Sequence, residues 1–137
     1  MIALFLDTGF LIALELSGDR HHETARAFWG IFSLAPEPLV TTSYVIDETL
    51  TFFNSRGFHA KAVEIGERLL ASRAVTVVHV DQALFREGFD FSRQNADKRY
   101  SLTDCISFAV MRKQAIKRAL AFDRHFTQAG FEKVPLI

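Results

Sequence analysis

The sequence is poor in cysteine and proline and has no excess charge of either sign. With Cys105 as its one cysteine, the 137-residue chain cannot form an intrachain disulfide, which suits a reducing compartment. Sixteen basic residues balance sixteen acidic ones, so no global positive field attracts nucleic acid. Any contact with a polyanion must therefore come from a local basic patch.

Long hydrophobic runs are also missing. The apolar start, residues 1–16, lacks the basic beginning of a signal peptide and is interrupted by Asp7 and Glu15. Nearly half of the residues are hydrophobic, 49%, and fourteen are Phe, which excludes a disordered chain. We therefore expect a cytoplasmic protein with no membrane contact, folded as one domain over residues 1–137.

Strand patterns alternate with helix patterns along the chain. Apolar or β-branched runs predict strands over residues 2–6, 39–41, 75–80 and 118–122, with a last one near Val134. The spacing of apolar residues predicts helices over 10–16, 22–32, 43–53, 58–71, 81–95 and 102–114, and a short one after residue 123. Such alternation is typical of an α/β fold in which helices cover both faces of a parallel sheet.

Two of these helices carry more detailed expectations. Ser43 precedes an apolar stripe and is expected to cap the helix that follows it. In the helix over 58–71 the inner stripe is expected to contain Ala62, Ile65, Leu69 and Leu70.

Two acidic residues follow predicted strands. Asp7 comes directly after the first strand, and Asp123 comes directly after the strand over 118–122. In open parallel sheets, ligands bind beyond the carboxyl ends of the strands. Each residue also has a structural explanation, because Asp7 can cap the next helix and Asp123 can close a turn.

Two further acids lie on helices. Asp104 stands at the head of the most apolar helix, and Ser101 and Asp104 have the spacing of a capping box. Glu48 falls at the edge of the apolar stripe of its helix, where its neighbour Asp47 is the alternative. Individually these acids are unremarkable, and only the set suggests a site.

Together these segments resemble the PIN-domain nucleases, and most of all the VapC-like toxins of type II toxin–antitoxin modules. The resemblance rests on Leu6-Asp7-Thr8, on Glu48, on Leu102-Thr103-Asp104-Cys105 and on Phe-Asp-Arg-His-Phe over residues 122–126. It implies a parallel sheet of about five strands, a metal-dependent endoribonuclease that hydrolyses phosphodiester bonds in RNA, a cognate antitoxin and a homodimer.

The resemblance also implies roles for individual residues. It makes Asp7, Glu48, Asp104 and Asp123 catalytic, with Asp7, Asp104 and Asp123 holding Mg²⁺ or Mn²⁺. Thr8 and Thr103 match hydroxyl residues beside the first and third acids, and are expected to bind substrate. The chain departs from the family at Ala121, where a Ser or Thr is common two residues before the fourth acid.

The chemistry agrees with an acidic site for a hard cation. A divalent ion activates water and offsets charge on the phosphate, and Mg²⁺ prefers carboxylate oxygens. No Cys/His cluster indicates zinc. Carboxylates gathered without a cation should have raised pKa values. Arg124, beside Asp123, is the best candidate to position a phosphate, whereas His125 is expected to cap the same turn and not to act as a general base.

Two other functions compete with the nuclease. A phosphotransfer or phosphatase-type α/β domain would use Asp7, but a phosphatase expects a second Asp where this chain has Gly9. A non-catalytic PIN module that binds RNA or protein would gain nothing from an acidic cavity.

Overall fold

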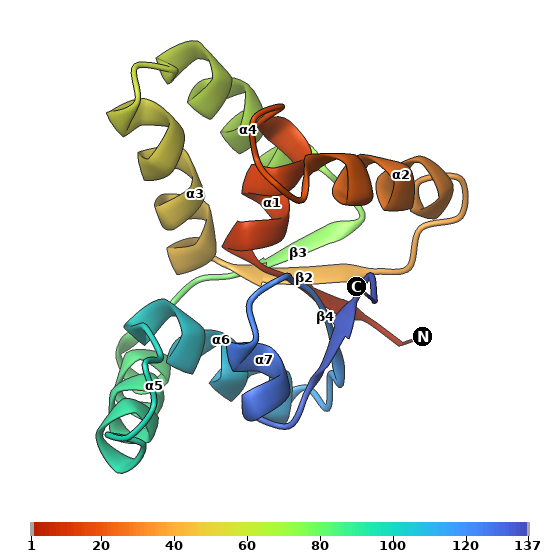
Figure 1. Ribbon diagram of the computed structural model, residues 1–137. Coiled ribbons are helices and arrows are strands. Elements are labelled where there is room, and N and C mark those ends of the chain that lie inside the picture. Colours follow the sequence, from red (N-terminus) through yellow and green to blue (C-terminus); the bar gives the residue numbers. More distant parts are fainter. Residues whose placement is uncertain (1, 137) are drawn as a thin grey trace.

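The centre of the molecule is a five-stranded parallel sheet, in a computed structural model that describes residues 2–136 (Figure 1). Its strands are β1 Leu4–Leu6, β2 Leu39–Thr42, β3 Val75–Val78, β4 Arg118–Leu120 and β5 Glu132–Val134. They lie in the order β3-β2-β1-β4-β5, and each neighbouring pair is parallel. The α/β fold class and the five-stranded sheet expected from the sequence are confirmed.

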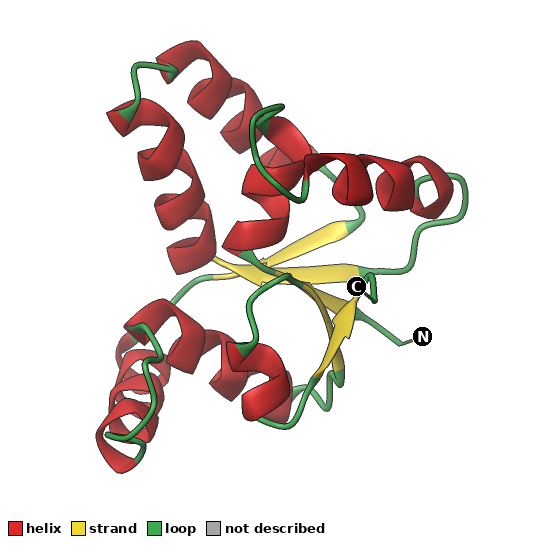
Figure 2. Ribbon diagram, in the orientation of Figure 1, coloured by secondary structure: helices red, strands yellow, loops and turns green. Residues whose placement is uncertain are grey.

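Helices cover both faces of the sheet (Figure 2). They are α1 Thr8–Glu15, α2 His22–Phe32, α3 Ser43–Ser55, α4 His59–Ala71, α5 Gln82–Gln94, α6 Leu102–Lys113 and α7 His125–Gln128. The first four lie on one side of the sheet and the last three on the other (Figure 1). Among residues 2–136, no helix combines the length and the apolar composition needed to cross a bilayer.

The core is densest around β1 and α6. All three residues of β1 are buried, as expected for a central parallel strand covered on both faces. Residues 104–111 of α6 are likewise all buried, including Cys105, so this cysteine is a packing residue. Gly88 lets α5 approach closely, since a Cβ atom there would lie 2.4 Å from Cγ1 of Ile106. This contact fixes the start of α6 and with it the position of Asp104.

The cap of α3 differs from the prediction. Thr42, not Ser43, is the N-cap, because its backbone is extended and its hydroxyl accepts a hydrogen bond from the Val45 N–H at 3.1 Å. Ser43 is already helical, and its hydroxyl accepts a hydrogen bond from the Val80 N–H at 2.9 Å. The Ser43 hydroxyl therefore ties the loop after β3 to the start of α3.

Two other expectations need correction. Leu70 is 66% exposed and does not belong to the inner stripe of α4, although Ala62, Ile65 and Leu69 are buried as predicted. A helical step of about 100° from Leu69 carries Leu70 out of the interface. The strand β4 ends at Leu120, so Asp123 lies in the following loop and not at the strand end.

Candidate metal site

The acidic residues lie where the order of the strands reverses, between β1 and β4. From β1 the chain proceeds to β2 and β3 on one side, whereas β4 and β5 lie on the other. Asp7 follows β1 directly, and its N–H donates to the Leu120 carbonyl at 3.1 Å, which extends the contact between β1 and β4. Asp123 lies in the loop after β4 and Asp104 in the first turn of α6. This is the switch point at which doubly wound sheets bind ligands.

Asp7 combines a structural and an electrostatic role. It is the N-cap of α1, and its Oδ2 accepts a hydrogen bond from the Gly9 N–H at 3.3 Å. The residue is only 5% exposed. Burial, followed by the negative charge of Asp104, raises the pKa of Asp7 to about 8. The charged form is therefore strongly disfavoured unless a cation approaches.

Asp104 completes the predicted capping box. Its N–H donates to the Ser101 hydroxyl at 3.0 Å, and its Oδ2 accepts a hydrogen bond from the Ser101 N–H at 3.2 Å. Burial raises the pKa of this carboxyl, while hydrogen bonds from His125 and the Ser101 backbone oppose the rise. The cap thus holds a buried carboxylate in one orientation at the head of α6.

His125 contacts two of the acidic residues. The sequence predicted only that it would cap the turn after Asp123. Its backbone N–H donates to Asp123 Oδ1 at 2.9 Å, which is the turn that the sequence suggested. Its ring reaches further, because Nδ1 lies 2.9 Å from Asp104 Oδ2 and 3.3 Å from Asp123 Oδ2. Tyr100 packs edge-on against the ring, with 5.3 Å between the centroids. The Asp-x-His spacing was the only local signal for this contact.

Glu48 and Asp47 are both exposed residues of α3. The negative charge of Glu48 contributes to the raised pKa of Asp7, and Asp47 is not among the causes of that rise. Which of the two acids belongs to the site stays a prediction, and Glu48 is the one whose charge adds to the raised pKa of Asp7.

The three expected substrate-binding residues differ in their surroundings. Thr8 is buried, and its hydroxyl points to the Val45 carbonyl at 3.5 Å. Thr103 is half-buried, and its carbonyl accepts a hydrogen bond from the Ser107 hydroxyl at 2.8 Å. Arg124 is exposed where α7 begins, and within residues 2–136 its side chain forms no hydrogen bond or ion pair. Their substrate-binding roles stay predictions.

The donor atoms fit a hard divalent cation. One ligand atom each from Asp104, Asp123 and His125 lies within 4.8 Å of the others, and Asp7 is coupled to Asp104 by charge. Carboxylate oxygens suit Mg²⁺ or Mn²⁺, whereas a zinc site would need more nitrogen or sulfur ligands. A cation would also relieve the unfavourable concentration of negative charge. Asp104, Asp123 and His125 supply the clustered ligand atoms, and the expected ligand set of Asp7, Asp104 and Asp123 stays a prediction.

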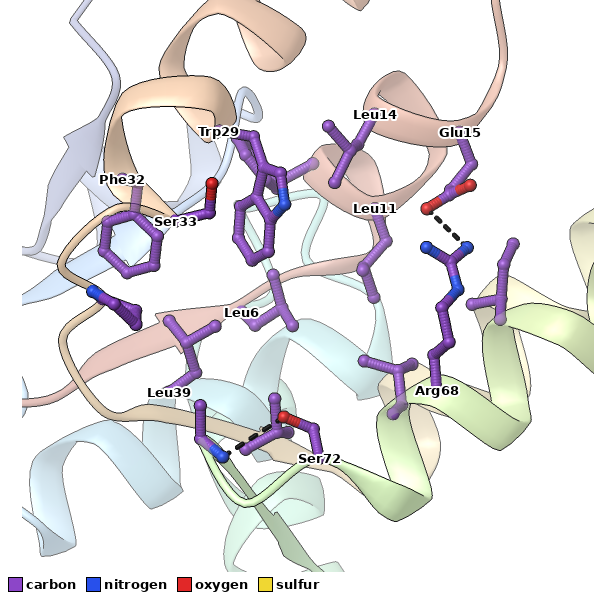
Figure 3. A pocket seen from close by; sticks show the side chains of 16 residues that line it. Leu6, Leu11, Leu14, Glu15, Trp29, Phe32, Ser33, Leu39, Arg68 and Ser72 are labelled. Atoms are coloured by element: carbon purple, nitrogen blue, oxygen red, sulfur yellow. Dashed lines mark hydrogen bonds and ion pairs between the residues drawn. The ribbon is translucent and has the colours of Figure 1, made fainter.

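An apolar cavity of about 230 Å³ lies apart from this site, between α1, α2, α4 and the strands (Figure 3). Trp29 and Leu11 face into it, and the ion pair between Glu15 and Arg68, 2.9 Å long, stands at one side. None of the candidate site's acids lines the cavity.

The fold and the site define an α/β protein with a cluster of acidic residues beyond the carboxyl ends of its strands. Residues 4–132 match the model of the PIN domain family, and the chain belongs to this family. The resemblance noticed in the sequence is thereby confirmed.

Individual relatives cover nearly the whole chain. The 23S rRNA-specific endonuclease VapC20 of Mycobacterium tuberculosis is 38% identical over 131 residues, which are 96% of this chain and 97% of that protein. The crystal structure of VapC20, described as a sarcin–ricin loop cleaving toxin, has a TM-score of 0.84 and covers 93% of this chain and 95% of its own.

Two more distant structures share the fold alone. FitAcB from Neisseria gonorrhoeae has a TM-score of 0.65 at 16% identity and covers 95% of both chains. A toxin–antitoxin complex from Klebsiella pneumoniae has a TM-score of 0.60 at 15% identity and covers 96% of this chain and 92% of the other.

Proposed function

We propose that the chain is an endoribonuclease that hydrolyses a phosphodiester bond of ribosomal RNA, dependent on Mg²⁺ or Mn²⁺. The observation that carries the proposal is the buried pair Asp7 and Asp104 at the switch point, with Asp123 and His125 beside it. The 38% identity to a 23S rRNA-specific endonuclease supports RNA as the substrate and the sarcin–ricin loop as the first target to examine.

The chain's own residues divide the work. When bound, a divalent cation would lower the pKa of a water and offset charge on the phosphate. Asp104 and Asp7 would supply carboxylate oxygens for that cation, and Asp7 would lose its proton when the cation binds. His125 orients the Asp104 carboxylate through the 2.9 Å hydrogen bond, as outer partners of metal ligands commonly do. We assign to Arg124, an exposed cation beside Asp123, the contact with a neighbouring phosphate.

The rival functions fit these residues less well. A phosphotransfer enzyme that uses Asp7 as nucleophile would need that carboxyl charged and accessible, yet it is buried with a pKa of about 8. A module that only binds RNA would gain nothing from buried negative charge, which repels phosphates and costs folding free energy. Hydrolysis assisted by a cation accounts for both features.

The proposal extends to partners and location. A ribonuclease that cuts ribosomal RNA harms its own cell, so an inhibitor made with it is needed, and we assign this chain the role of toxin in a toxin–antitoxin module. Formation of a homodimer and a place in the cytoplasm belong to the same proposal.

The test uses the purified chain and a hairpin RNA that carries the sarcin–ricin loop. We expect one cut with Mg²⁺ or Mn²⁺, no cut in EDTA, and recovery when excess Mg²⁺ is added. Cleavage unaffected by EDTA would contradict the metal dependence. Absence of cleavage of this hairpin and of total RNA, with either metal, would overturn the nuclease function.

A matched pair of variants on α3 tests the second acid. Glu48→Gln is expected to lower kcat/KM for RNA by about tenfold or more, because it removes charge that acts on Asp7. Asp47→Asn, a neighbouring exposed acid, is expected to change kcat/KM by less than about twofold. Initial cleavage rates at several RNA concentrations give both values. The reverse order would assign the role to Asp47.

A further inference from the structure

A stack of aromatic rings runs from the core to the surface beside the candidate metal site. Phe10 is buried and packs on Phe122, with 5.8 Å between centroids and 18° between ring planes. The His21 ring is also stacked on Phe122, with 4.3 Å between centroids and 12° between ring planes. His21 is half-buried, and within residues 2–136 no second aromatic ring contacts it. His21 is therefore the partly exposed member of the stack, whereas Phe10 is its buried member.

The turn that carries His21 is rigid. The Asp19 carboxylate accepts a hydrogen bond from the His21 N–H at 2.8 Å, and the Asp19 carbonyl accepts one from the His22 N–H at 3.0 Å. The His22 ring is held 2.7 Å from the Ala13 carbonyl of α1. Arg20 Nε donates to His21 Nε2 at 3.1 Å, which fixes the rotation of the ring. A surface ordered in advance binds a flat partner at little entropic cost.

The stack adjoins two acids of the site. Phe122 is the residue before Asp123, and its carbonyl accepts a hydrogen bond from the Lys133 ammonium group at 3.1 Å. Phe10 lies one helical turn after Asp7 on α1. The His21 ring is therefore stacked on the residue that directly precedes one acid of the site.

Arg20 adds a positive charge at the same place. Its side chain is exposed, and within residues 2–136 no carboxylate forms an ion pair with it. With Nε bound to His21, the two terminal amino groups of the guanidinium remain for a phosphate. An aromatic face beside a cation is the arrangement with which proteins bind single-stranded nucleic acid.

We propose that His21, backed by Phe122 and Phe10, is a stacking platform for a nucleobase next to the phosphodiester that is cut, while Arg20 contacts the adjoining phosphate. The proposal rests on the proposed RNA cleavage and adds a positioning residue to it. Stacking accepts any base, so the platform holds the RNA in place without selecting its sequence.

Substitution of His21 tests the platform. His21→Ala is expected to raise KM for the hairpin RNA by about tenfold, with a smaller change in kcat, because one base loses its stacking partner. His21→Phe keeps a flat ring and should restore KM to within about threefold of wild type. His59→Ala, at the start of α4, is the control histidine and should leave KM unchanged. Thermal unfolding of each variant shows whether it is folded.

A second change, made in the RNA, distinguishes loss of base stacking from a general effect of His21→Ala on the structure of the protein. The nucleotides flanking the cut are replaced one at a time by an abasic residue. At one position, loss of the base should make wild type and His21→Ala equal in KM. If the two proteins have equal KM on intact RNA, or if their ratio stays the same with every abasic RNA, the platform is wrong.

A binding experiment keeps this proposal distinct from the cleavage itself. In the Asp104→Asn background, RNA with 2-aminopurine at the stacked position should lose fluorescence on binding. The additional change His21→Ala should abolish that quenching. If the wild-type chain cleaves no RNA, the proposed function fails while this quenching still decides on the platform. Quenching that persists without His21 overturns it.

Discussion

Replacing Asp104 by Asn is expected to lower RNA cleavage by more than about 100-fold while the fold stays intact. Loss of an outer partner of a metal site typically costs about 10- to 100-fold, and Asp104 would be a direct ligand. This carboxyl also interacts with Asp7, Asp123 and His125, so it is the most connected acid of the site. Asparagine retains an oxygen for the Ser101 N–H, which preserves the cap of α6.

Single-turnover cleavage of the hairpin RNA measures this effect. Asp97→Asn is the matched control, because the Asp97 side chain is 76% exposed and, among residues 2–136, forms an ion pair only with the adjacent Lys98. The control should cleave at the wild-type rate, and both variants should unfold at temperatures close to that of the wild type. Binding of RNA to Asp104→Asn should remain measurable. Cleavage by Asp104→Asn within tenfold of wild type would remove Asp104 from the catalytic set.

Replacing Asp7 by Asn is expected to stabilise the metal-free protein at alkaline pH by about 2 kcal/mol or more. The pKa of Asp7 is about 8 in the folded state and about 3.9 in an unfolded chain. Between these values the folded state binds more protons, so wild-type stability falls as the pH rises from about 4 to about 8. Asparagine has no such charge and still accepts a hydrogen bond from the Gly9 N–H.

Urea unfolding in EDTA at several pH values tests this expectation. The two proteins should have similar free energies of unfolding near pH 4, and the advantage of Asp7→Asn should grow up to pH 8 and then level off. Added Mg²⁺ should stabilise the wild type and do much less for the variant, because only a folded protein with its ligands gains from the metal. A variant less stable than wild type at pH 8 in EDTA would show that the charge of Asp7 does not destabilise the metal-free protein.

The two predictions describe one physical feature. The buried carboxyl of Asp7 has a pKa of about 8, so it carries a proton at neutral pH. Binding of a cation would displace this proton. Cleavage should therefore depend jointly on pH and metal concentration, with more metal required as the pH falls. The negative charge that destabilises the apo protein is the same charge that would retain the ion.

Short-range structure was predictable from the sequence. Apolar runs and their spacing indicated five strands, the helices between them and therefore a parallel sheet. The caps formed by Asp7, Ser101 and Asp81 were also predictable, because they depend on hydrogen bonds between residues two or three positions apart. Thr42 is the N-cap of α3 in place of Ser43. Both residue types can cap a helix, and the position at which β2 ends determined which of them does so.

The contacts that build the site depend on tertiary structure. His125 reaches Asp104 because β4 lies beside β1 and α6 packs under the loop that follows β4, a proximity that no local pattern encodes. Whether Glu48 or Asp47 faces the site likewise depends on how α3 is rotated about its axis. The stack of His21 on Phe122 joins two distant turns.

By itself, then, the sequence determined the elements and the sheet class, it indicated the family, and it predicted a set of acids for the site. Strands and helices form through backbone hydrogen bonds and the burial of apolar side chains, and both follow a pattern of residues only a few positions apart. Only the folded chain decided which side chains touch, because strand order and helix packing bring together residues far apart in sequence.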